Sequence, residues 1–339
     1  MSLMLEEARS AASVVAAQEQ ATEPLLAALA EDLRASPPSV ALTVARGSSD
    51  HAANYFGYLL MQRIGIPVVS LPMSLLTLHN APMRVGGQFA LAMSQSGRSP
   101  DLIATMNALT DSGARTAALV NQPNSPLAAS CKWAIPLCAG VEQSVAATKS
   151  YIATLSAAAC LVAHWQNNRQ LLSAVHALAQ SLTLATEIDW TPAIEKLKPV
   201  KRIMIIGRGL GFAVALEAAL KLKETCAIQA EAFSSAEVRH GPMELIDEGY
   251  PLLVFAPRGP EQAGLIDLAK EMRLRGAIVL LAAPENVISR DLTIATAADE
   301  ALDPVLLIQT FYLMAARLAE ARGLNPDAPR HLEKVTCTV

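Results

Sequence analysis

Apolar residues in this chain form short runs, each followed by a longer segment with helical spacing. The runs Val40 to Ala45, Val68 to Leu71, Phe89 to Met93 and Thr116 to Val120 have the length and composition of buried strands. Trp133 to Leu137 could add a short one. Strands that alternate with helices predict parallel sheets covered by helices.

The same order of elements occurs a second time. Strands are expected at Arg202 to Ile206, Pro251 to Ala256 and Ala277 to Ala282, with a helix from about Phe212 to Gln229 after the first of them. The glycine pairs Gly47/Gly207, Gly97/Gly259 and Gly113/Gly276 keep an offset of about 160 residues, which indicates an internal duplication.

We therefore expect an α/β fold with two similar domains, each a parallel sheet flanked by helices. The expected divisions are a helical segment at 1–34, a first domain at 35–188, a second domain at 189–322 and an extended tail at 323–339. The helical pattern that begins near Lys149 should continue to about Glu187. The length of 339 residues is that of roughly two domains.

Composition excludes several classes of partner. The net charge of −4 gives no attraction to nucleic acid or to an anionic membrane, and the apolar run Leu155 to His164 is too short to span a bilayer. The five cysteines lack CxxC spacing, which argues against a disulfide framework and a structural zinc site and for a reducing compartment. The N-terminus is acidic and helical, unlike a signal peptide, so we expect a cytoplasmic protein.

A hydroxyl-rich turn, Ser94-Gln95-Ser96-Gly97, separates the strand Phe89 to Met93 from a helix that starts beyond Pro100. Amide groups at a helix start and nearby hydroxyls can bind an anion. The turn has no lysine and no GxxxxGK[ST] motif, so a monophosphate suits it better than a nucleotide. An ordinary loop whose serines cap the helix is an equally good interpretation. A similar turn at Gly47-Ser48-Ser49 follows the first strand, and ligands of parallel sheets bind at such carboxyl ends.

Charged residues recur along the helix expected in the second half. Glu217, Lys221 and Glu224 stand at i, i+4 and i+7, so they share one face. A solvated stripe of ion pairs is the ordinary explanation, but the flanks are apolar, and buried charges at a cleft often serve catalysis. His240 is followed by Gly241-Pro242, which would fix its ring on a loop, although an isolated histidine is more often structural.

Two further stretches have limited meaning by themselves. The GxGxG turn at 207–211 lacks the last glycine of a dinucleotide motif, because position 212 is Phe, so no nicotinamide or flavin cofactor is expected. Lys334 lies in the proline-containing tail and would matter only if the tail closes over a site.

Together, these stretches resemble the tandem sugar isomerase (SIS) domains that form the isomerase half of glutamine–fructose-6-phosphate aminotransferases. The resemblance covers nearly the whole chain and rests on Gly47-Ser48-Ser49, Ser94-Gln95-Ser96-Gly97, Glu142 to Lys149, Ala219 to Glu224, Glu237 to Pro242 and Arg330 to Thr336. It implies two tandem SIS domains with a flavodoxin-like three-layer α/β/α arrangement.

The resemblance also implies roles for single residues. The sugar phosphate would be held by Ser49, Ser94, Gln95, Ser96 and Ser99, with Gly47, Ser48, Glu142 and the backbone of Val145 as further binding positions. Glu224 would move the proton between C1 and C2, with support from Lys221 and Glu217. His240 would assist ring opening in the partner subunit's site, and Lys334 would form or assist a Schiff base. Ser99 and Arg98 replace the family's usual Thr and Glu.

These roles predict an enzyme without a cofactor or metal that acts on a hexosamine or hexose 6-phosphate, as a homodimer. Because the sequence starts at the SIS part, with no glutaminase domain ahead of it, it resembles stand-alone SIS-type glucosamine-6-phosphate deaminases, which produce fructose 6-phosphate and ammonia. A fructosamine-6-phosphate deglycase, a plain aldose–ketose isomerase and a non-catalytic phosphosugar-binding regulator are the alternatives. Residues 1–34 are too short and too acidic for the DNA-binding segment of a regulator.

Overall fold

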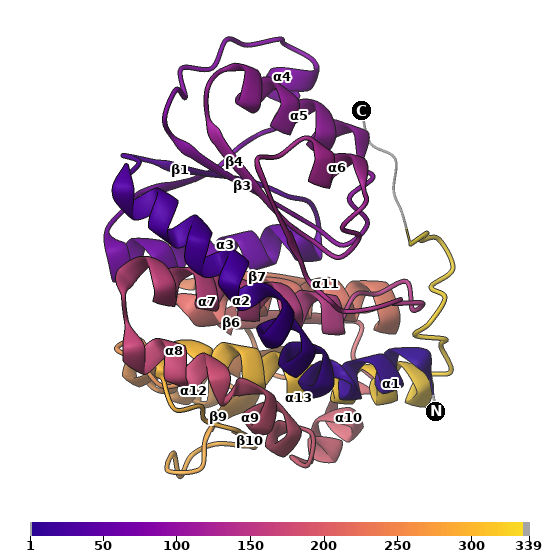
Figure 1. The fold of residues 1–339 in the computed structure, drawn as a ribbon. Helices are drawn as coiled ribbons and strands as arrows, with labels where there is room; N and C mark the ends of the chain where they lie inside the picture. The colour runs from indigo at the N-terminus through magenta and orange to yellow at the C-terminus, as the bar shows by residue number, and fades with distance from the viewer. Residues whose placement is uncertain (1, 335–339) are drawn as a thin grey trace. The chain divides into compact units, whose positions relative to one another are not determined.

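The computed structural model describes residues 2–334 (Figure 1). The last part of the expected tail, residues 335–339, lies outside the described residues. The α-helices are α1 (Leu3–Arg9), α2 (Ala11–Ala35), α3 (Ser48–Ile64), α4 (Ser74–Thr77), α5 (Pro100–Asp111), α6 (Pro126–Ala129), α7 (Lys149–Gln166), α8 (Arg169–His176), α9 (Leu178–Ala185), α10 (Thr191–Leu197), α11 (Leu210–Cys226), α12 (Gln262–Leu274) and α13 (Asp303–Ala321). The strands are β1 (Ala41–Val44), β2 (Val68–Ser70), β3 (Phe89–Ser94), β4 (Arg115–Val120), β5 (Trp133–Pro136), β6 (Arg202–Gly207), β7 (Gln229–Ser234), β8 (Pro251–Phe255), β9 (Ile278–Pro284) and β10 (Leu292–Ile294). Short 3₁₀ helices lie at η1 (Glu237–His240), η2 (Pro242–Leu245) and η3 (Glu300–Leu302).

The chain forms two compact units whose segments interleave. The first-sheet unit contains Ser13–Glu142, Lys149–His176 and residues 333–334. The second-sheet unit contains residues 2–12, Gln143–Thr148 and Ala177–Leu332. Contiguous domains at 35–188 and 189–322 were expected, so the interleaving was not visible in the sequence.

The first sheet has the strand order β2-β1-β3-β4-β5, and all its strands are parallel. Strands β1 and β3 are buried along their whole length, as expected where helices cover both faces. Alternate residues therefore point to opposite layers. Val44 and Ala92 join a cluster with Leu102 and Met106 of α5, whereas the ring of Phe89 packs at 5.7 Å against Trp165 of α7.

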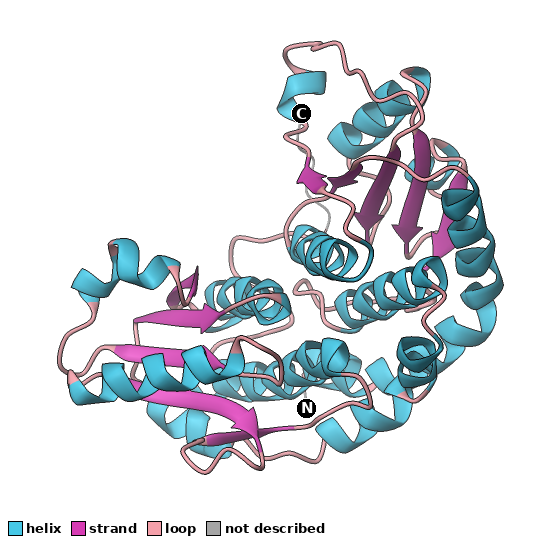
Figure 2. Cartoon of the chain, turned by 90° about the vertical axis from the view of Figure 1, so that its left-hand side faces the viewer, coloured by secondary structure: helices cyan, strands magenta, loops and turns pink. Residues whose placement is uncertain are grey.

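The second sheet repeats this plan. Its strand order is β10-β9-β8-β6-β7. Starting from β7, the strands come second, first, third, fourth and fifth in their unit, which is the same order as in the first sheet. One face packs on α12, and the other carries Phe255, whose ring lies 6.2 Å from that of Phe311 in α13. Figure 2 shows the strands of each sheet between helices. The expected α/β fold and its internal duplication are confirmed.

Two predicted helices were too long. The helix expected to reach Gln229 ends at Cys226, because Ala227 turns to a left-handed conformation with φ of +51°, and Gln229–Ser234 forms the edge strand β7. The helical pattern expected up to Glu187 is broken after Gln166, where Asn167 has φ of +55°. Both left-handed residues carry side chains, so no glycine marks these ends in the sequence.

A long apolar helical segment near the end of the described chain belongs to the core. Glu300–Ala321 is the one helix among the described residues with the length and composition to cross a membrane, but 94% of its apolar window is buried. A core helix of a folded domain has the same composition. Sequence analysis considered only Leu155 to His164 in this respect.

Candidate functional site

Two loops meet at the carboxyl ends of neighbouring strands in the first sheet. The loop after β1 leads into α3, and the loop after β3 leads into α5. Strand order reverses between these two strands, since β2 lies outside β1 and β4 lies outside β3. In an open parallel sheet, this is the position where ligands bind. Two helix N-termini therefore point their unpaired amide groups to one place.

A pocket of about 300 Å³ lies at this place. It is lined by Arg46, Gly47, Ser49, Met93, Ser94, Gln95, Ser96, Ser99, Leu102 and Lys334. The structure thus brings together most of the residues expected to hold the phosphate, and it places Lys334 of the tail beside them. Ser48 is the first residue of α3 and does not line the pocket.

The turn after β3 has a conformation that depends on glycine. Gly97 has φ of +64°, and a Cβ on it would lie 2.5 Å from the Cβ of Ser125 and 2.9 Å from Val120 Cγ2. The hydroxyl of Ser94 accepts a hydrogen bond from the Gly97 amide at 3.0 Å, and that of Ser96 accepts one from the Arg98 amide at 3.3 Å. These serines therefore hold the turn in shape as well as facing the pocket.

Arg46 is a pocket residue that was not among the expected site residues. Its side chain is 55% exposed, and its Nε and one terminal nitrogen both lie 3.1 Å from Oδ2 of the buried Asp101 in α5. The ion pair joins the two loops and directs a guanidinium group to the pocket, where it can bind a phosphate. An arginine that directly follows a strand and precedes the Gly47 turn was the available signal.

The carboxylate of Asp50 lies close to the same loop. Burial raises its pKa, while His51, a hydrogen bond from Ser70 and the charge of Arg46 oppose the shift. The hydroxyl of Ser70 donates to Oδ1 of Asp50 over 3.4 Å. Burial is therefore the dominant influence on the pKa of this carboxyl group.

Lys334 forms an ion pair with Glu142, also in the first-sheet unit. The Nζ of Lys334 donates to Oε2 of Glu142 at 3.0 Å, and the Glu142 side chain is fully buried. Ser150 donates to Glu142 through its amide at 3.2 Å and through its hydroxyl at 2.7 Å. The carboxylate is therefore held in position at the N-terminal end of α7 with one oxygen towards the lysine.

The charged stripe of α11 is a buried network of the second-sheet unit. Lys221 lies 3.5 Å from Oε1 of Glu217 and makes a very short contact with Oε2 of Glu224. The Tyr312 hydroxyl of α13 donates to Glu217 Oε1 at 2.9 Å. Side chains of Glu217 and Lys221 are at most 1% exposed, while Glu224 is 20% exposed. The solvated-stripe explanation is therefore wrong, and Glu224 is the member of the network that solvent can reach.

A pocket of about 560 Å³ adjoins Glu224. Its walls come from the end of α11 and the loop after α13: Leu220, Lys223, Glu224, Thr225, Ala227, Gly323, Leu324, Asn325, Ala328, Pro329, Arg330, His331 and Leu332. Six of these residues have apolar side chains and six have polar or charged ones, among which Glu224 supplies the carboxylate. The pocket can therefore enclose a small molecule whose reacting atoms face Glu224.

The other expected site residues have different surroundings. His240 is exposed at the end of η1 and lines neither of these two pockets. The Val145 amide donates to the carbonyl oxygen of Asp327 at 3.0 Å, so this amide already has a partner. Each is in the second-sheet unit.

The second sheet has an equivalent pair of loops, after β6 and β8, but it is closed by the chain itself. Gly209 has nearly the same conformation as Gly47, with φ and ψ of 56° and −134° against 54° and −132°. Glu261 stands two residues after Gly259, as Ser99 stands two residues after Gly97. A Cβ on Gly209 would lie 2.5 Å from Oε1 of Glu261, so this carboxylate occupies the space that an anion would need. In the part of the chain that the structure describes, the loops of the first sheet line an open hydroxyl pocket, whereas Glu261 fills the equivalent position of the second sheet.

Comparison with known proteins places these features in a family. The family model described as SIS domain matches residues 39–164 and 196–319. The glutamine–fructose-6-phosphate aminotransferase (isomerizing) of Symbiobacterium thermophilum is 34% identical over 312 residues, which cover 86% of this chain and 50% of the relative. That of Aeropyrum pernix is 36% identical over 321 residues, 88% of this chain and 51% of the relative. The chain spans about half the length of these relatives.

Solved structures share the whole fold. A candidate phosphosugar isomerase from Silicibacter pomeroyi DSS-3 has a TM-score of 0.92 and 36% identity, with 96% of this chain and 100% of that chain covered. The C-terminal domain of glucosamine-fructose-6-phosphate aminotransferase from Francisella tularensis has a TM-score of 0.84 and 25% identity, with 96% and 98% covered. The family match, the two similar sheets and these relatives lead to one conclusion. The chain belongs to the SIS domain family and contains the domain in two segments.

Proposed function

We propose that this chain is a phosphosugar isomerase that converts glucosamine 6-phosphate to fructose 6-phosphate and ammonia. The observation that carries the proposal is the contact of the buried Lys221 ammonium with Glu224, the exposed end of the α11 network, at the wall of a pocket. A carboxylate held in this way can take a proton from one carbon and return it to the next. The chain spans half of its curated relatives, so the proposal concerns the sugar chemistry alone.

Glu224 is the proposed base for the isomerisation. It would remove the proton from C2 of the open-chain amino sugar and return it to C1, which leaves a C2 imine. Water then adds to the imine carbon, and the C–N bond breaks to release ammonia. Lys221 stabilises Glu224 as the carboxylate and the developing enediol-type charge, while Glu217 and Tyr312 hold Lys221 through hydrogen bonds and charge.

The hydroxyl pocket of the first-sheet unit is the proposed phosphate site. Helix N-termini, the Ser49, Ser94 and Ser96 hydroxyls and the Arg46 guanidinium group provide donors for a phosphate. Phosphate binding at a position remote from the reacting carbons supplies energy for orientation. Lys334 would assist at the carbonyl carbon, after its ammonium group has passed a proton to Glu142, because an ammonium cannot attack a carbonyl.

Ammonia release tests the proposal directly. The purified chain would receive glucosamine 6-phosphate without glutamine, and ammonia and fructose 6-phosphate would be measured together. Glu224→Gln should lower the rate by about 10²–10⁴-fold, the usual contribution of a general base. Glu231→Gln, an exposed glutamate of β7, is the matched control and should keep full activity. If the chain binds the sugar phosphate but does not convert it, the enzyme proposal fails, and a non-catalytic phosphosugar-binding regulator becomes the better interpretation.

A fructosamine-6-phosphate deglycase is a second candidate, and the size of the pocket at Glu224 favours it. A volume of about 560 Å³, with Leu220, Leu324 and Leu332 among its walls, is more than the amino group of glucosamine 6-phosphate needs. The departing amine of a substituted fructosamine would bring an apolar group next to the same base. Comparison of glucosamine 6-phosphate with an N-alkylated fructosamine 6-phosphate, by kcat/KM, decides between the two.

We also propose a homodimer in which His240 acts in the partner subunit's site. Its exposure, away from both pockets of its own chain, supports this assignment. An inactive His240→Ala variant, denatured and refolded with an inactive Lys334→Ala variant, should recover about a quarter of the wild-type activity if half of the molecules form mixed dimers with one intact site. Absence of any recovery in verified mixed dimers would contradict the shared site.

A further inference from the structure

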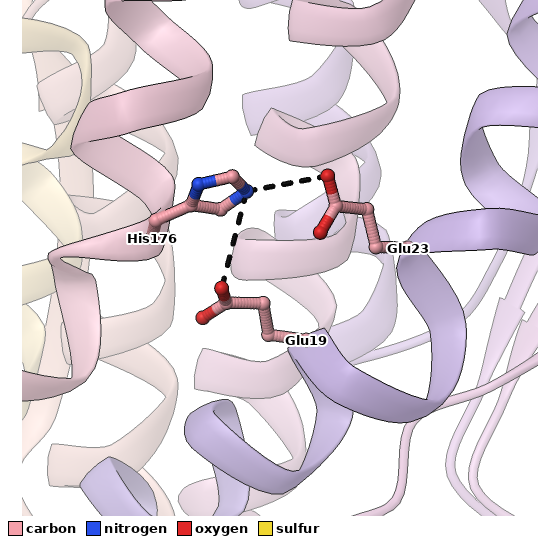
Figure 3. Close-up of side chains that lie close together, drawn as sticks. All are labelled: Glu19, Glu23 and His176. Carbon is pink, nitrogen blue, oxygen red and sulfur yellow. Dashed lines mark hydrogen bonds and ion pairs between the residues drawn. The ribbon is translucent and has the colours of Figure 1, made fainter.

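Four side chains from three helices gather in the first-sheet unit, apart from the residues proposed for phosphosugar chemistry. Glu19 and Glu23 project from α2, His164 from the end of α7 and His176 from the last turn of α8. Nε2 of His176 lies 3.2 Å from Oε1 of Glu23 and 3.9 Å from Oε1 of Glu19, and Nε2 of His164 lies 3.3 Å from Oε1 of Glu23. Figure 3 shows the His176 ring pointing towards both carboxylates.

The spacing of these atoms matches that of ligands around a small cation. Zinc binds histidine nitrogen and carboxylate oxygen at about 2.0–2.2 Å, so neighbouring ligands in a tetrahedral site are about 3.4 Å apart. The ligand atoms of Glu19, Glu23 and His176 all lie within 4.8 Å of one another. Two imidazoles approach one oxygen of Glu23 at nearly equal distances.

The electrostatic arrangement also calls for a cation. Glu19 and Glu23 stand one helical turn apart, where like charges repel each other. Nε2 of His164 is buried and makes no hydrogen bond of acceptable geometry, although it lies close to Glu23. If the Nε2 of His164 carries no proton, its lone pair faces the carboxylate of Glu23, and a cation nearby would balance this arrangement.

The negative charges of Glu19 and Glu23 also affect the nearby thiol of Cys160. Cys160 lies one turn before His164 in α7, and burial together with the charges of Glu23 and Glu19 raises the pKa of its thiol to about 12. Burial is the larger cause, and the two carboxylates add to it. The cluster is nevertheless open to solvent, since the side chains of Glu19 and His176 are 26% and 40% exposed. An ion can enter, and a water molecule can complete its coordination.

We propose that Glu19, Glu23 and His176 form a binding site for a divalent metal ion with a preference for zinc, with a water molecule as the fourth ligand and His164 beside Glu23. The imidazole nitrogen of His176 favours zinc over calcium or magnesium, and carboxylates are common additional ligands of zinc. The ion would join α2 to α8 and so stabilise the first-sheet unit. The site is independent of the proposed isomerase activity. The sequence argument against a structural zinc site considered cysteine ligands only. The ligands proposed here are glutamate and histidine residues that lie far apart in the sequence, between positions 19 and 176.

Zinc binding to the full chain is the test. Metal-free protein would be titrated with zinc chloride by calorimetry, and cobalt(II) would be added in parallel as a spectroscopic probe of coordination. We expect one ion per chain, the intense visible absorption of tetrahedral cobalt and a rise in Tm with zinc. His176→Gln and Glu23→Gln, each with a similar shape, should weaken zinc binding at least about tenfold. His79→Ala removes an exposed histidine of a loop and is the matched control.

Several outcomes would overturn the site. Zinc binding that His176→Gln and Glu23→Gln leave unchanged would locate the ion elsewhere, and no binding at zinc concentrations up to the millimolar range would mean that the cluster is a set of His–Glu ion pairs. Weak octahedral cobalt spectra would exclude the tetrahedral site. Ammonia release should continue in the presence of a chelator, so failure of the isomerase proposal and failure of the metal site give different results.

Discussion

Lys334 and Glu142 are 192 positions apart in the sequence, and the ammonium of the first lies 3.0 Å from the carboxylate of the second. Glu142 is fully buried and receives two further hydrogen bonds from Ser150. Lys334 also lines the hydroxyl pocket with Ser94. The pair therefore links the tail to the candidate phosphate site, and it offers a nearby acceptor for the proton that the lysine must lose before it can act on a carbonyl.

Glu142→Gln should separate catalysis from binding. The amide keeps the shape of the side chain but cannot take the Lys334 proton, so we expect kcat to fall about 10²-fold with a much smaller change in KM. Steady-state kinetics with glucosamine 6-phosphate measure both. Glu333→Gln, an exposed neighbour, serves as control. Equal activity of Glu142→Gln and wild type would show that Glu142 is not needed to accept the proton of Lys334.

Gly97→Ala should damage the phosphate turn. The new methyl group would meet Ser125 and Val120, and φ of +64° is unfavourable for alanine. We expect a loss of about 1–3 kcal/mol in the free energy of unfolding and a clear loss of inorganic phosphate binding. Gly87→Ala is the matched control, because Gly87 has φ of +73° with no atom near its added Cβ. If both variants lose the same stability and bind phosphate alike, steric closure at Gly97 is not important.

Tyr312→Phe should weaken the buried network of α11. The variant removes the hydroxyl that donates to Glu217 at 2.9 Å, and a buried carboxylate loses a donor. We expect a loss of about 1–3 kcal/mol in unfolding free energy, measured by urea denaturation. A parallel fall in kcat would follow from displacement of Lys221 and hence of Glu224. Tyr58→Phe, at a partly exposed tyrosine, should change neither quantity. Unchanged stability in Tyr312→Phe would show that the hydroxyl contributes nothing.

Acid should loosen the segment that carries His240. A hydrogen bond from Arg239 lowers the pKa of Glu271 below its ordinary value of 4.5, with a smaller contribution from Arg275. A lowered pKa in the folded state means that the pair stabilises the protein fully above pH 4.5, and that this contribution is lost as the pH falls through the lower folded value. Stability of Glu271→Gln should therefore fall less steeply below pH 4.5 than that of wild type.

Urea denaturation at a series of pH values tests this relationship. The side chains of Arg239 and Glu271 are 51% and 32% exposed, so the difference should be small and should shrink at high salt. Glu285→Gln, at an exposed loop, should follow the wild-type curve. Identical slopes for wild type and Glu271→Gln would mean that Arg239 has no effective ion pair in solution.

Local pattern was sufficient for most of the fold and for the main parts of the candidate site. The turns at Gly47 and Gly97, and the stripe of Glu217, Lys221 and Glu224, consist of residues a few positions apart. Their spacing therefore follows from strand and helix geometry alone. The duplication was also visible, because it preserves the order of glycine turns over about 160 residues.

Short-range pattern failed where the chain depends on distant partners. Edge strand β7 has only one buried residue among its six, so it carries no apolar run, and pairing with β6 decides its conformation. The ends of α7 and α11 fall at left-handed Asn167 and Ala227, where tertiary packing overrides a continuous helical pattern.

Only the tertiary structure determined which charges meet. Sequence spacing places a side chain on a helix face or at a strand end, but it does not say which other element faces it. The pairs Arg46–Asp101, Lys334–Glu142 and Tyr312–Glu217, and the cluster around Glu23, all join residues of different elements. The sequence by itself therefore determined the elements, their repetition and the chemistry available, whereas chain packing decided the partners, because burial and contact at long range depend on the whole fold.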